Sequence, residues 1–241
     1  MSRKKLKTIG ILGGMGPEAG SYFFEKIVRE TVAGRDQDHP PVVLYCLPQV
    51  PDRTMAILHG GPSPVPALRR GLRALSRAGA DFAVISCISA HYFYPRIAPD
   101  SPVPLISLID ETLAVIGKMR PVPKTIGLLA TTGTVRSALI TQAFGAAGIA
   151  VITPSARNQK RVMTAIYGRK GIKAGSTEGP PRTILLEIAA GLVSRGAQAI
   201  LAGCTEVPLV VRAADLPVPL IEPMIIGARA AIRRAGATPR P

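Results

Sequence analysis

Two stretches of the chain, "TIGILGGMGP" (8–17) and "TIGLLATTGT" (125–134), are near copies of one another separated by 117 positions. Each begins with a short apolar run and passes into glycine and hydroxyl-bearing residues, which is typical of a buried strand followed by a turn. A second pair, "GADFAVISC" (79–87) and "GAQAILAGC" (196–204), has the same separation. The shared spacing predicts that the chain contains two copies of one structural unit.

A third pair supports the repeat, since "PVPLISL" from Pro102 recurs as "PVPLIEP" from Pro217, an offset of 115. Amphipathic segments, such as 20–34 and 181–196, lie between most of the short apolar runs. Because strands buried on both faces of a parallel sheet are continuously apolar, this alternation predicts an α/β fold with parallel sheets. The expected strands lie in the runs "TIGILGG", "PVVLYCLP", "DFAVISC", "VPLISL", "TIGLLAT", "IAVITP", "QAILAGC" and "VPLIEP".

The repeat also predicts how the chain divides. We expect two similar parallel-sheet α/β domains related by internal pseudo-symmetry, residues 1–105 plus 218–241 and residues 106–217. In parallel α/β sheets, ligands bind beyond the carboxyl ends of the strands. Cys87 and Cys204 end equivalent strands. We therefore expect the active site in the cleft between the domains, with one cysteine from each.

The two cysteines indicate acid and base chemistry at carbon. A thiol at a helix N-terminus has a lowered pKa, because the helix dipole and the free N–H groups favour the thiolate. Two such groups on opposite faces of a carbon acid can invert its configuration, since one removes the α-proton and the other supplies a proton from behind. The turns at 13–17 and 131–134 offer donors for the charge that collects on the carboxylate.

Simpler interpretations of these features stay open. A single cysteine at the end of a buried strand is usually a small core residue, and we expect this of Cys46. The glycines in 14–20 loosely resemble a dinucleotide-binding turn, but their spacing is G-x-G-x-x-x-G and no convincing acidic residue ends the following strand. Pro17 and Glu18 suit the first turn of a helix, so a plain strand-to-helix turn also explains this stretch.

The composition favours a cytoplasmic protein. The 241 residues are 47% hydrophobic, and no apolar run reaches the roughly 18 to 20 residues needed to cross a bilayer. The basic start at 1–7 precedes a stretch that is too short and too rich in glycine for a signal peptide. The three cysteines and three histidines are spaced in a way that predicts neither a disulfide framework nor a metal site.

The net charge of +15 raises the hypothesis of a nucleic-acid partner, because clustered Lys and Arg neutralise phosphates. Dense basic runs, however, occur only at 3–7 and around 167–173, and elsewhere the arginines stand singly on helix-like segments. Since the chain also lacks an RNA-binding signature, nucleic acid is the less favoured partner. A positive field also steers small anions toward a site.

Several motifs occur in one order along nearly the whole chain. They are "GILGGMGPEA" (10–19), "PQVPDRT" (48–54), a strand cysteine followed by "AHYFY" (90–94), "GLLATTGT" (127–134), "KAG" (173–175) and "GCTEVPL" (203–209). With them the chain resembles the aspartate/glutamate racemase superfamily, and within it the cofactor-independent aspartate racemases. The resemblance implies two similar α/β domains with the active site between them, often a homodimer, and neither pyridoxal phosphate nor a metal.

The resemblance also implies roles for individual residues. Cys87 and Cys204 match the two acid/base residues, the same pair to which the internal repeat points. Arg53 and Lys173 match the residues that bind the substrate's side-chain carboxylate, and a dianionic substrate does need a second cation. The remaining candidate substrate-binding residues are Met15, Gln49, Ile88, Ser89, Ala90, Thr132, Thr134, Thr205 and Glu206.

Two neighbours of the cysteines have roles that the sequence leaves open. Glu206, which follows Cys204 and Thr205, either orients or tunes the thiol or charges the first turn of the next helix. His91 lies one turn after Cys87 and is either a structural helix residue or a catalytic one.

At two positions the chain departs from the family pattern, and both changes make the pocket less polar. The family's first cysteine is usually followed by Asn-Thr, whereas this chain has Ile88 and Ser89. Ser89 keeps a hydroxyl, but Ile88 cannot make the hydrogen bonds of an amide. The residue before Pro48 is also apolar, where the family prefers a polar residue. The identity of the substrate is therefore the least determined part of the prediction.

These observations leave three hypotheses. The leading one is a racemase that inverts aspartate or glutamate by two-base proton transfer. The second keeps the fold but acts on a non-acidic amino acid, or is a related decarboxylase or isomerase. The third is a non-enzymatic protein that binds anions or nucleic acid.

Overall fold

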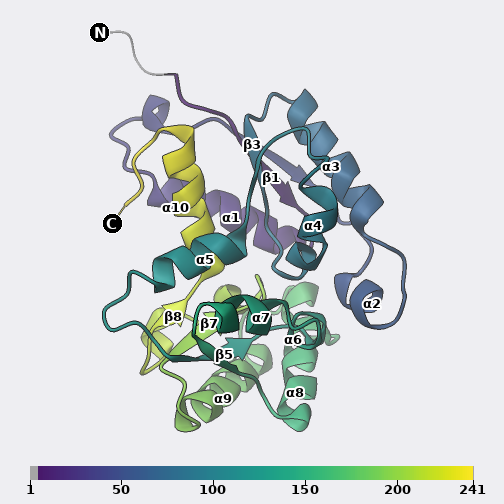
Figure 1. Ribbon diagram of the computed structural model, residues 1–241, viewed down its shortest axis with the longest axis vertical. Helices are drawn as coiled ribbons and strands as arrows, with labels where there is room; N and C mark the ends of the chain where they lie inside the picture. The colour runs from purple at the N-terminus through teal and green to yellow at the C-terminus, as the bar shows by residue number, and fades with distance from the viewer. Residues whose placement is uncertain (1–4, 241) are drawn as a thin grey trace.

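A computed structural model describes residues 5–240, so the first four residues of the basic N-terminal segment lie outside the described part. Figure 1 shows two lobes, each built around a parallel sheet. The first lobe has the strand order β2-β1-β3-β4 and the second lobe has β6-β5-β7-β8. The strands are β1 (Ile9–Gly13), β2 (Val42–Cys46), β3 (Phe82–Ile85), β4 (Leu105–Ile106), β5 (Thr125–Leu129), β6 (Ala150–Ile152), β7 (Ala199–Ala202) and β8 (Leu220–Ile221).

The predicted strands are all present, and the sequence repeat is a structural repeat. Ile9 of β1 pairs with Phe82 of β3, while Ile126 of β5 pairs with Ala199 of β7. Each residue of the second pair lies 117 positions after its counterpart in the first. Because the strand orders also correspond, the predicted α/β fold with two similar parallel-sheet units is confirmed.

Helices pack on both faces of the sheets. Along β1, Ile11 packs with Phe23 on one face, and Leu12 packs with Leu68 on the other. The α-helices are α1 (Pro17–Glu30), α2 (Arg53–Leu58), α3 (Val65–Arg77), α4 (Tyr94–Ile97), α5 (Leu108–Ile116), α6 (Thr132–Arg136), α7 (Leu139–Ala146), α8 (Ala156–Tyr167), α9 (Pro180–Ser194) and α10 (Pro223–Ala235). The short 3₁₀ helices are η1 (Asp36–Asp38), η2 (Ser89–Phe93), η3 (Ile172–Ala174), η4 (Val207–Leu209) and η5 (Ala213–Asp215). In residues 5–240, no helix combines the length and the apolarity needed to cross a membrane.

Helix α1 begins where its sequence signals predict, but it ends before the amphipathic segment does. Pro17 is its first residue and Glu18 lies in its first turn. The helix stops at Glu30, although the amphipathic segment continues to residue 34. Thr31 takes an extended conformation, and its hydroxyl donates to the carbonyl of Ile27, so a local side-chain bond replaces the next helical turn.

The C-terminal part of the chain contributes to both lobes. Strand β8 completes the second sheet, and α10 then returns to pack against α1 and α5 (Figure 1). The division into residues 1–105 plus 218–241 and residues 106–217 remains a prediction. The two lobes are defined by their sheets.

The prediction that Cys46 is a core residue is wrong, because its side chain is exposed. Cys46 ends β2, which is the edge strand of the first sheet. Only one side of this strand is paired, and none of its five residues is fully buried. The apolar run "VVLYCLP" does not distinguish an edge strand from a central one.

Candidate active site

The two cysteines that the repeat predicts to face each other line one cavity between the lobes. The cavity has a volume of about 10 Å³, which is room for roughly one water molecule. The first lobe contributes Met15, Arg53, Cys87, Ile88 and Ser89, and the second contributes Thr131, Thr134, Tyr167, Lys173, Gly203, Cys204, Thr205 and Glu206.

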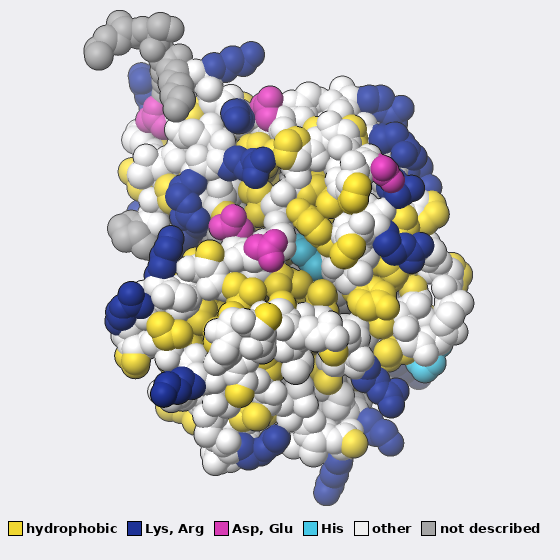
Figure 2. Space-filling model, in the orientation of Figure 1, with side chains coloured by type: hydrophobic (Ala, Val, Ile, Leu, Met, Phe, Trp, Pro, Cys, Tyr) yellow, Lys and Arg dark blue, Asp and Glu magenta, His cyan; other side chains and the backbone are white. Residues whose placement is uncertain are grey.

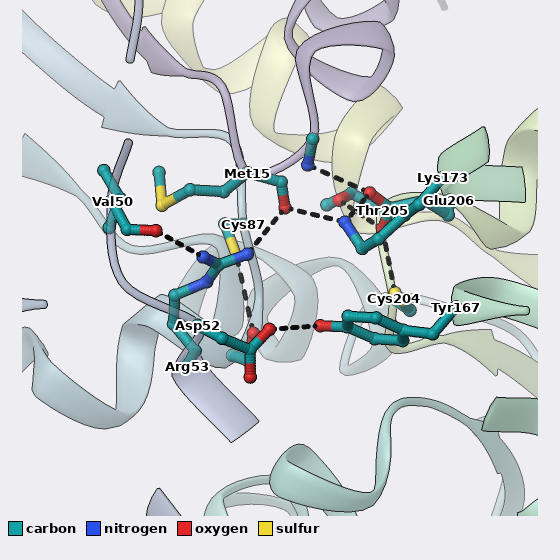
Figure 3. A network of polar contacts seen from close by, with 12 residues as sticks. Met15, Val50, Asp52, Arg53, Cys87, Tyr167, Lys173, Cys204, Thr205 and Glu206 are labelled. Atoms are coloured by element: carbon teal, nitrogen blue, oxygen red, sulfur yellow. Dashed lines mark hydrogen bonds and ion pairs between the residues drawn. The ribbon is translucent and has the colours of Figure 1, made fainter. Parts of the chain in front are cut away.

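A wider cavity of about 330 Å³ leads toward this inner cavity. Five residues line both spaces and form the constriction between them, namely Met15, Arg53, Tyr167, Lys173 and Glu206. Figure 3 shows these side chains converging from the two lobes. A molecule larger than water reaches the two cysteines only if this constriction widens.

Cys87 lies just beyond the end of β3 and before η2. Its sulfur is buried and lies 3.4 Å from the Ser89 hydroxyl oxygen. The expected helix after Cys87 is a 3₁₀ helix, whose first residue is Ser89.

His91 fixes the backbone around Cys87. The backbone N–H of Leu108 donates to His91 Nε2 at 3.0 Å, so the ring proton is on Nδ1, which lies 2.9 Å from the carbonyl oxygen of Cys87. Burial lowers the pKa of this imidazole, which keeps it neutral. Of the two roles left open for His91, the structure supports the structural one.

Cys204 is in a different electrostatic environment. Its thiol donates to Glu206 Oε2 at 2.9 Å, and both groups are buried. Burial, followed by the charge of Glu206, raises the pKa of the Cys204 thiol well above its ordinary value. The lowered pKa expected from a helix N-terminus is therefore wrong for Cys204, because burial and the neighbouring carboxylate outweigh the short η4.

Glu206 joins the two lobes through Oε1 and contacts its own lobe through Oε2. Oε1 accepts the backbone N–H of Gly16 at 3.0 Å and forms an ion pair with Lys173, while Oε2 also accepts from the Thr205 hydroxyl at 3.2 Å. Burial alone would raise the pKa of Glu206, but the charge of Lys173 and these hydrogen bonds lower it. Of the two open roles for Glu206, the contact with the Cys204 thiol is the one observed.

Arg53 and Lys173 reach the constriction from opposite lobes and share an acceptor. Arg53 Nη2 and Lys173 Nζ each donate to the carbonyl oxygen of Met15 at 3.2 Å (Figure 3). Arg53 Nη1 donates to the carbonyls of Val50 and Pro51, whereas its buried Nε has no hydrogen-bond partner. Within residues 5–240, Arg53 forms no ion pair with a carboxylate.

Three predicted substrate-binding residues lie outside the inner cavity. Gln49 is exposed on the loop before α2, and Ala90 is a fully buried residue of η2. Thr132 faces a separate cavity on the second lobe, where its hydroxyl accepts a hydrogen bond from Gln159. Its neighbour Thr131 lines the inner cavity instead, since that residue caps α6.

Sequence reasoning missed a contact that bridges the lobes at the cavity mouth. The Tyr167 hydroxyl donates to Asp52 Oδ2 at 2.9 Å, and Lys173 Nζ lies 5.5 Å from the centre of the Tyr167 ring. Asp52 precedes Arg53 and also caps α2, while Tyr167 ends α8. Their nearness to Arg53 and Lys173 in the sequence was the available signal for both residues.

The two-lobed fold gathers two cysteines and two cations around one small cavity, and such a cluster of titratable groups in a cleft is typical of an enzyme site for a small molecule. The chain belongs to the Asp/Glu/Hydantoin racemase family, which it matches over residues 12–231. Racemases are isomerases, so the chain is an enzyme of this class, and the non-enzymatic hypothesis has no support.

Individual relatives agree with this family. The chain is similar to the broad specificity amino-acid racemase RacX of Bacillus subtilis, with 27% identity over 89% of this chain and 92% of that protein. It is also similar to the solved structure of Picrophilus torridus aspartate racemase, with 31% identity, a TM-score of 0.87 and coverage of 97% and 96% of the two chains. A glutamate racemase from Francisella tularensis, 16% identical with a TM-score of 0.67, shares the fold over 95% of this chain and 81% of its own.

Proposed function

We propose that the chain is a cofactor-independent amino-acid racemase and that aspartate is its leading substrate, with glutamate as the other acidic candidate. The observation that carries this proposal is the pair of sulfurs, Cys87 and Cys204, which line one cavity from equivalent strand ends of the two lobes. The aspartate racemase of Picrophilus torridus supports the choice of substrate, since its identity with this chain, 31%, is higher than the 27% and 16% of the other two relatives named above.

The reaction requires one proton to leave and another to arrive. The thiolate of one cysteine takes the α-proton, and the electron pair of the broken C–H bond becomes a carbanion delocalised into the substrate's carboxylate. The thiol of the other cysteine donates its proton to the opposite face of the carbon. The product has inverted configuration, and the two sulfurs have exchanged protonation states.

Two cations are available for an acidic substrate. Arg53 carries a buried N–H without a partner, and Lys173 lies across the constriction from it. A carboxylate accepting from Arg53 Nε would satisfy a donor that is costly to leave unpaired. The Ser89 and Thr134 hydroxyls line the inner cavity and offer further donors.

A racemase of a non-acidic amino acid is the second candidate. Ile88 lines the inner cavity next to Cys87 and offers only an apolar side chain there. The relative from Bacillus subtilis is described as having broad specificity for amino acids, which also favours this candidate.

The test is to incubate single enantiomers of a panel of amino acids with the enzyme in D₂O and to read α-deuterium by NMR and configuration by chiral chromatography. We expect aspartate to exchange and racemise fastest, and racemisation to collapse in both Cys87→Ala and Cys204→Ala. Exchange that is fastest with a neutral amino acid would select the second candidate. Normal racemisation by both variants would contradict the two-cysteine mechanism.

A cytoplasmic location and a homodimeric assembly are also part of the proposal. The location rests on the composition of the chain. The homodimer is supported by an apolar surface of the first lobe, to which α1 and β2 contribute the exposed side chains of Phe24, Val28 and Leu44.

A further inference from the structure

The internal repeat places different residues beside its two cysteines, and one of these differences is a charge. Ser89 lies two residues after Cys87, and Glu206 lies two residues after Cys204, so the two are 117 positions apart and structurally equivalent. Each contacts the sulfur of its own lobe. The distance is 3.4 Å from the Ser89 hydroxyl to Cys87, and 2.9 Å from the Glu206 carboxylate to Cys204. The repeat therefore places a neutral group beside one thiol and an anion beside the other.

Glu206 is well held in its position. Its side chain is buried, and its two oxygens accept from four different groups, those of Gly16, Lys173, Cys204 and Thr205. Since Lys173 and the backbone N–H of Gly16 favour the ionised form, Glu206 is a carboxylate and acts only as an acceptor. Cys204 must then be the donor in the contact between them.

We propose that Glu206 is a positioning residue that keeps the proton on Cys204, so that the resting enzyme holds Cys204 as the acid and leaves Cys87 to act first as the base. The proposal rests on the racemase function proposed above. A thiolate at Cys204 would lie against a buried carboxylate, and the low local dielectric makes that repulsion large. Removing the proton from Cys204 in the resting enzyme is therefore costly, whereas Cys87 has the neutral Ser89 hydroxyl and the Arg53 cation beside it and no carboxylate in contact.

The other charged groups around Cys204 do not cancel this effect. Lys173, from η3, is the nearest cation, but its ammonium already pairs with Glu206. Tyr167, from α8, and Arg53 and Cys87, from the first lobe, line the same cavity, and Tyr167 donates its hydroxyl away to Asp52. Glu206 is the carboxylate that contacts a thiol in this cavity.

The protonation of Cys204 in the resting enzyme makes the two enantiomers of the substrate kinetically different. If Cys204 starts as the acid, the resting enzyme accepts the enantiomer whose α-hydrogen faces Cys87. The other enantiomer requires the proton to move first from Cys204 to Cys87. The two directions then differ in kcat and in KM separately, while kcat/KM stays equal because the enantiomers have equal free energies.

The test measures the protonation of each thiol without any substrate. Alkylation by iodoacetamide follows the thiolate, so its rate against pH, read for each cysteine by peptide mass spectrometry, reports each thiol separately. In the unaltered enzyme we expect the midpoint for Cys204 to lie above the ordinary value of about 8.5. In Glu206→Gln we expect that midpoint to fall by about one pH unit, which makes alkylation of Cys204 about tenfold faster below it.

Cys87 is the internal control, because it lies in the same cavity and shares its access. Its rate should change by less than about twofold in Glu206→Gln, against about tenfold for Cys204, because Glu206 contacts the Cys204 thiol and not the Cys87 thiol. Glu206→Asp retains the carboxylate and should keep Cys204 slow, whereas Glu206→Ser, which copies the first lobe, should behave like Glu206→Gln. Circular dichroism checks that each variant is folded.

An unchanged or slower alkylation of Cys204 in a folded Glu206→Gln variant would overturn the proposal. If the variant does not fold, a midpoint for Cys204 at or below about 8.5 in the unaltered enzyme would overturn it as well. Because no substrate is involved, the result is independent of racemisation. Cys87→Ala and Cys204→Ala can lose racemase activity even if Glu206 has no influence on the Cys204 thiol. Glu206 can likewise control the Cys204 thiol even if these two variants still racemise.

Discussion

At the scale of the residue, the arrangement of Arg53 explains why an arginine stands there. Its guanidinium donates to three backbone carbonyls, those of Met15, Val50 and Pro51, which hold the group in one orientation. A buried N–H group remains without a partner and is available to a substrate. A lysine has neither the fork of donors nor the fixed plane that this arrangement needs.

Arg53→Lys should therefore weaken substrate binding although it keeps the charge. We expect KM for aspartate to rise about 10- to 100-fold, as loss of a charged hydrogen bond of about 1.5–3 kcal/mol predicts. Steady-state kinetics measure this. Arg69→Lys is the control, because Arg69 pairs with the exposed Asp100 away from the cavity. Equal KM values in Arg53→Lys and the unaltered enzyme would contradict the role of Arg53.

At the scale of the element, α2 of the first lobe packs against α6 of the second, and a glycine permits the close approach. A Cβ atom on Gly133 would lie 2.9 Å from the Cα atom of Thr54 and 2.7 Å from its hydroxyl oxygen. The backbone of Thr54 cannot rotate away from such an atom. Any larger residue at position 133 must push the two helices, and with them the lobes, apart.

Gly133→Ala should hold the cleft in a wider state. Since α6 also carries Thr134 of the inner cavity, we expect a several-fold loss of kcat/KM and a lower melting temperature, with overpacking costing about 1–3 kcal/mol. Gly145→Ala on α7 is the matched control, because a Cβ atom there meets nothing within 4 Å. Kinetics and thermal unfolding of both variants provide the comparison, and equal behaviour of the two would contradict the steric argument.

A second contact between elements joins α1 to the start of α10. The Tyr22 hydroxyl donates to Glu222 Oε1 at 2.8 Å, and burial raises the pKa of the Glu222 carboxyl despite this hydrogen bond. Because the folded pKa lies above the unfolded value of about 4.3, the folded state binds more protons between the two values. Stability from this group is therefore present below about pH 4.3 and is lost as pH rises through the folded pKa.

Glu222→Gln removes this titration and keeps an acceptor for Tyr22. We expect the melting temperature of Glu222→Gln to be close to that of the unaltered protein near about pH 4 and to exceed it increasingly toward about pH 8, because only the unaltered protein then buries a charge at this position. Thermal unfolding at several pH values measures this difference. Glu25→Gln, on the exposed face of α1, serves as the control. A difference for Glu222→Gln that is constant with pH would show that burial of the charge is not its cause.

At the scale of the whole molecule, the first lobe presents an apolar surface on α1 and β2. Phe24, Val28 and Leu44 are each between 37% and 42% exposed. Leu44 packs toward Gly20, and Phe24 and Val28 continue the same face of α1 at successive turns. A second copy of the chain is the occupant that the proposed homodimer predicts for this surface.

Val28→Asp should weaken that homodimer, because it places a charge in the apolar surface. We expect light scattering with size-exclusion chromatography to report a lower mass for this variant at micromolar concentration. Val122→Asp is the control, since Val122 is similarly exposed but lies on the segment before β5. A dimer that persists unchanged in Val28→Asp would exclude this surface as the interface.

The charge of the molecule is also a property of the whole. Figure 2 shows Lys and Arg side chains spread in separate groups over the face that it presents, with hydrophobic and uncharged surface between them. A net charge of +15 acts as a long-range field that attracts small anions.

The sequence by itself determined the two parallel sheets, their strands and the pairing of Cys87 with Cys204, because strand patterns and a repeat are local properties of the chain. Only the tertiary structure decided that Cys46 on the edge strand is exposed, and that Thr131 rather than Thr132 lines the inner cavity. It also decided the contacts between lobes, such as Tyr167 with Asp52, which join residues 115 positions apart. Such contacts depend on how the two lobes are placed relative to each other. No periodic pattern in the sequence encodes that placement.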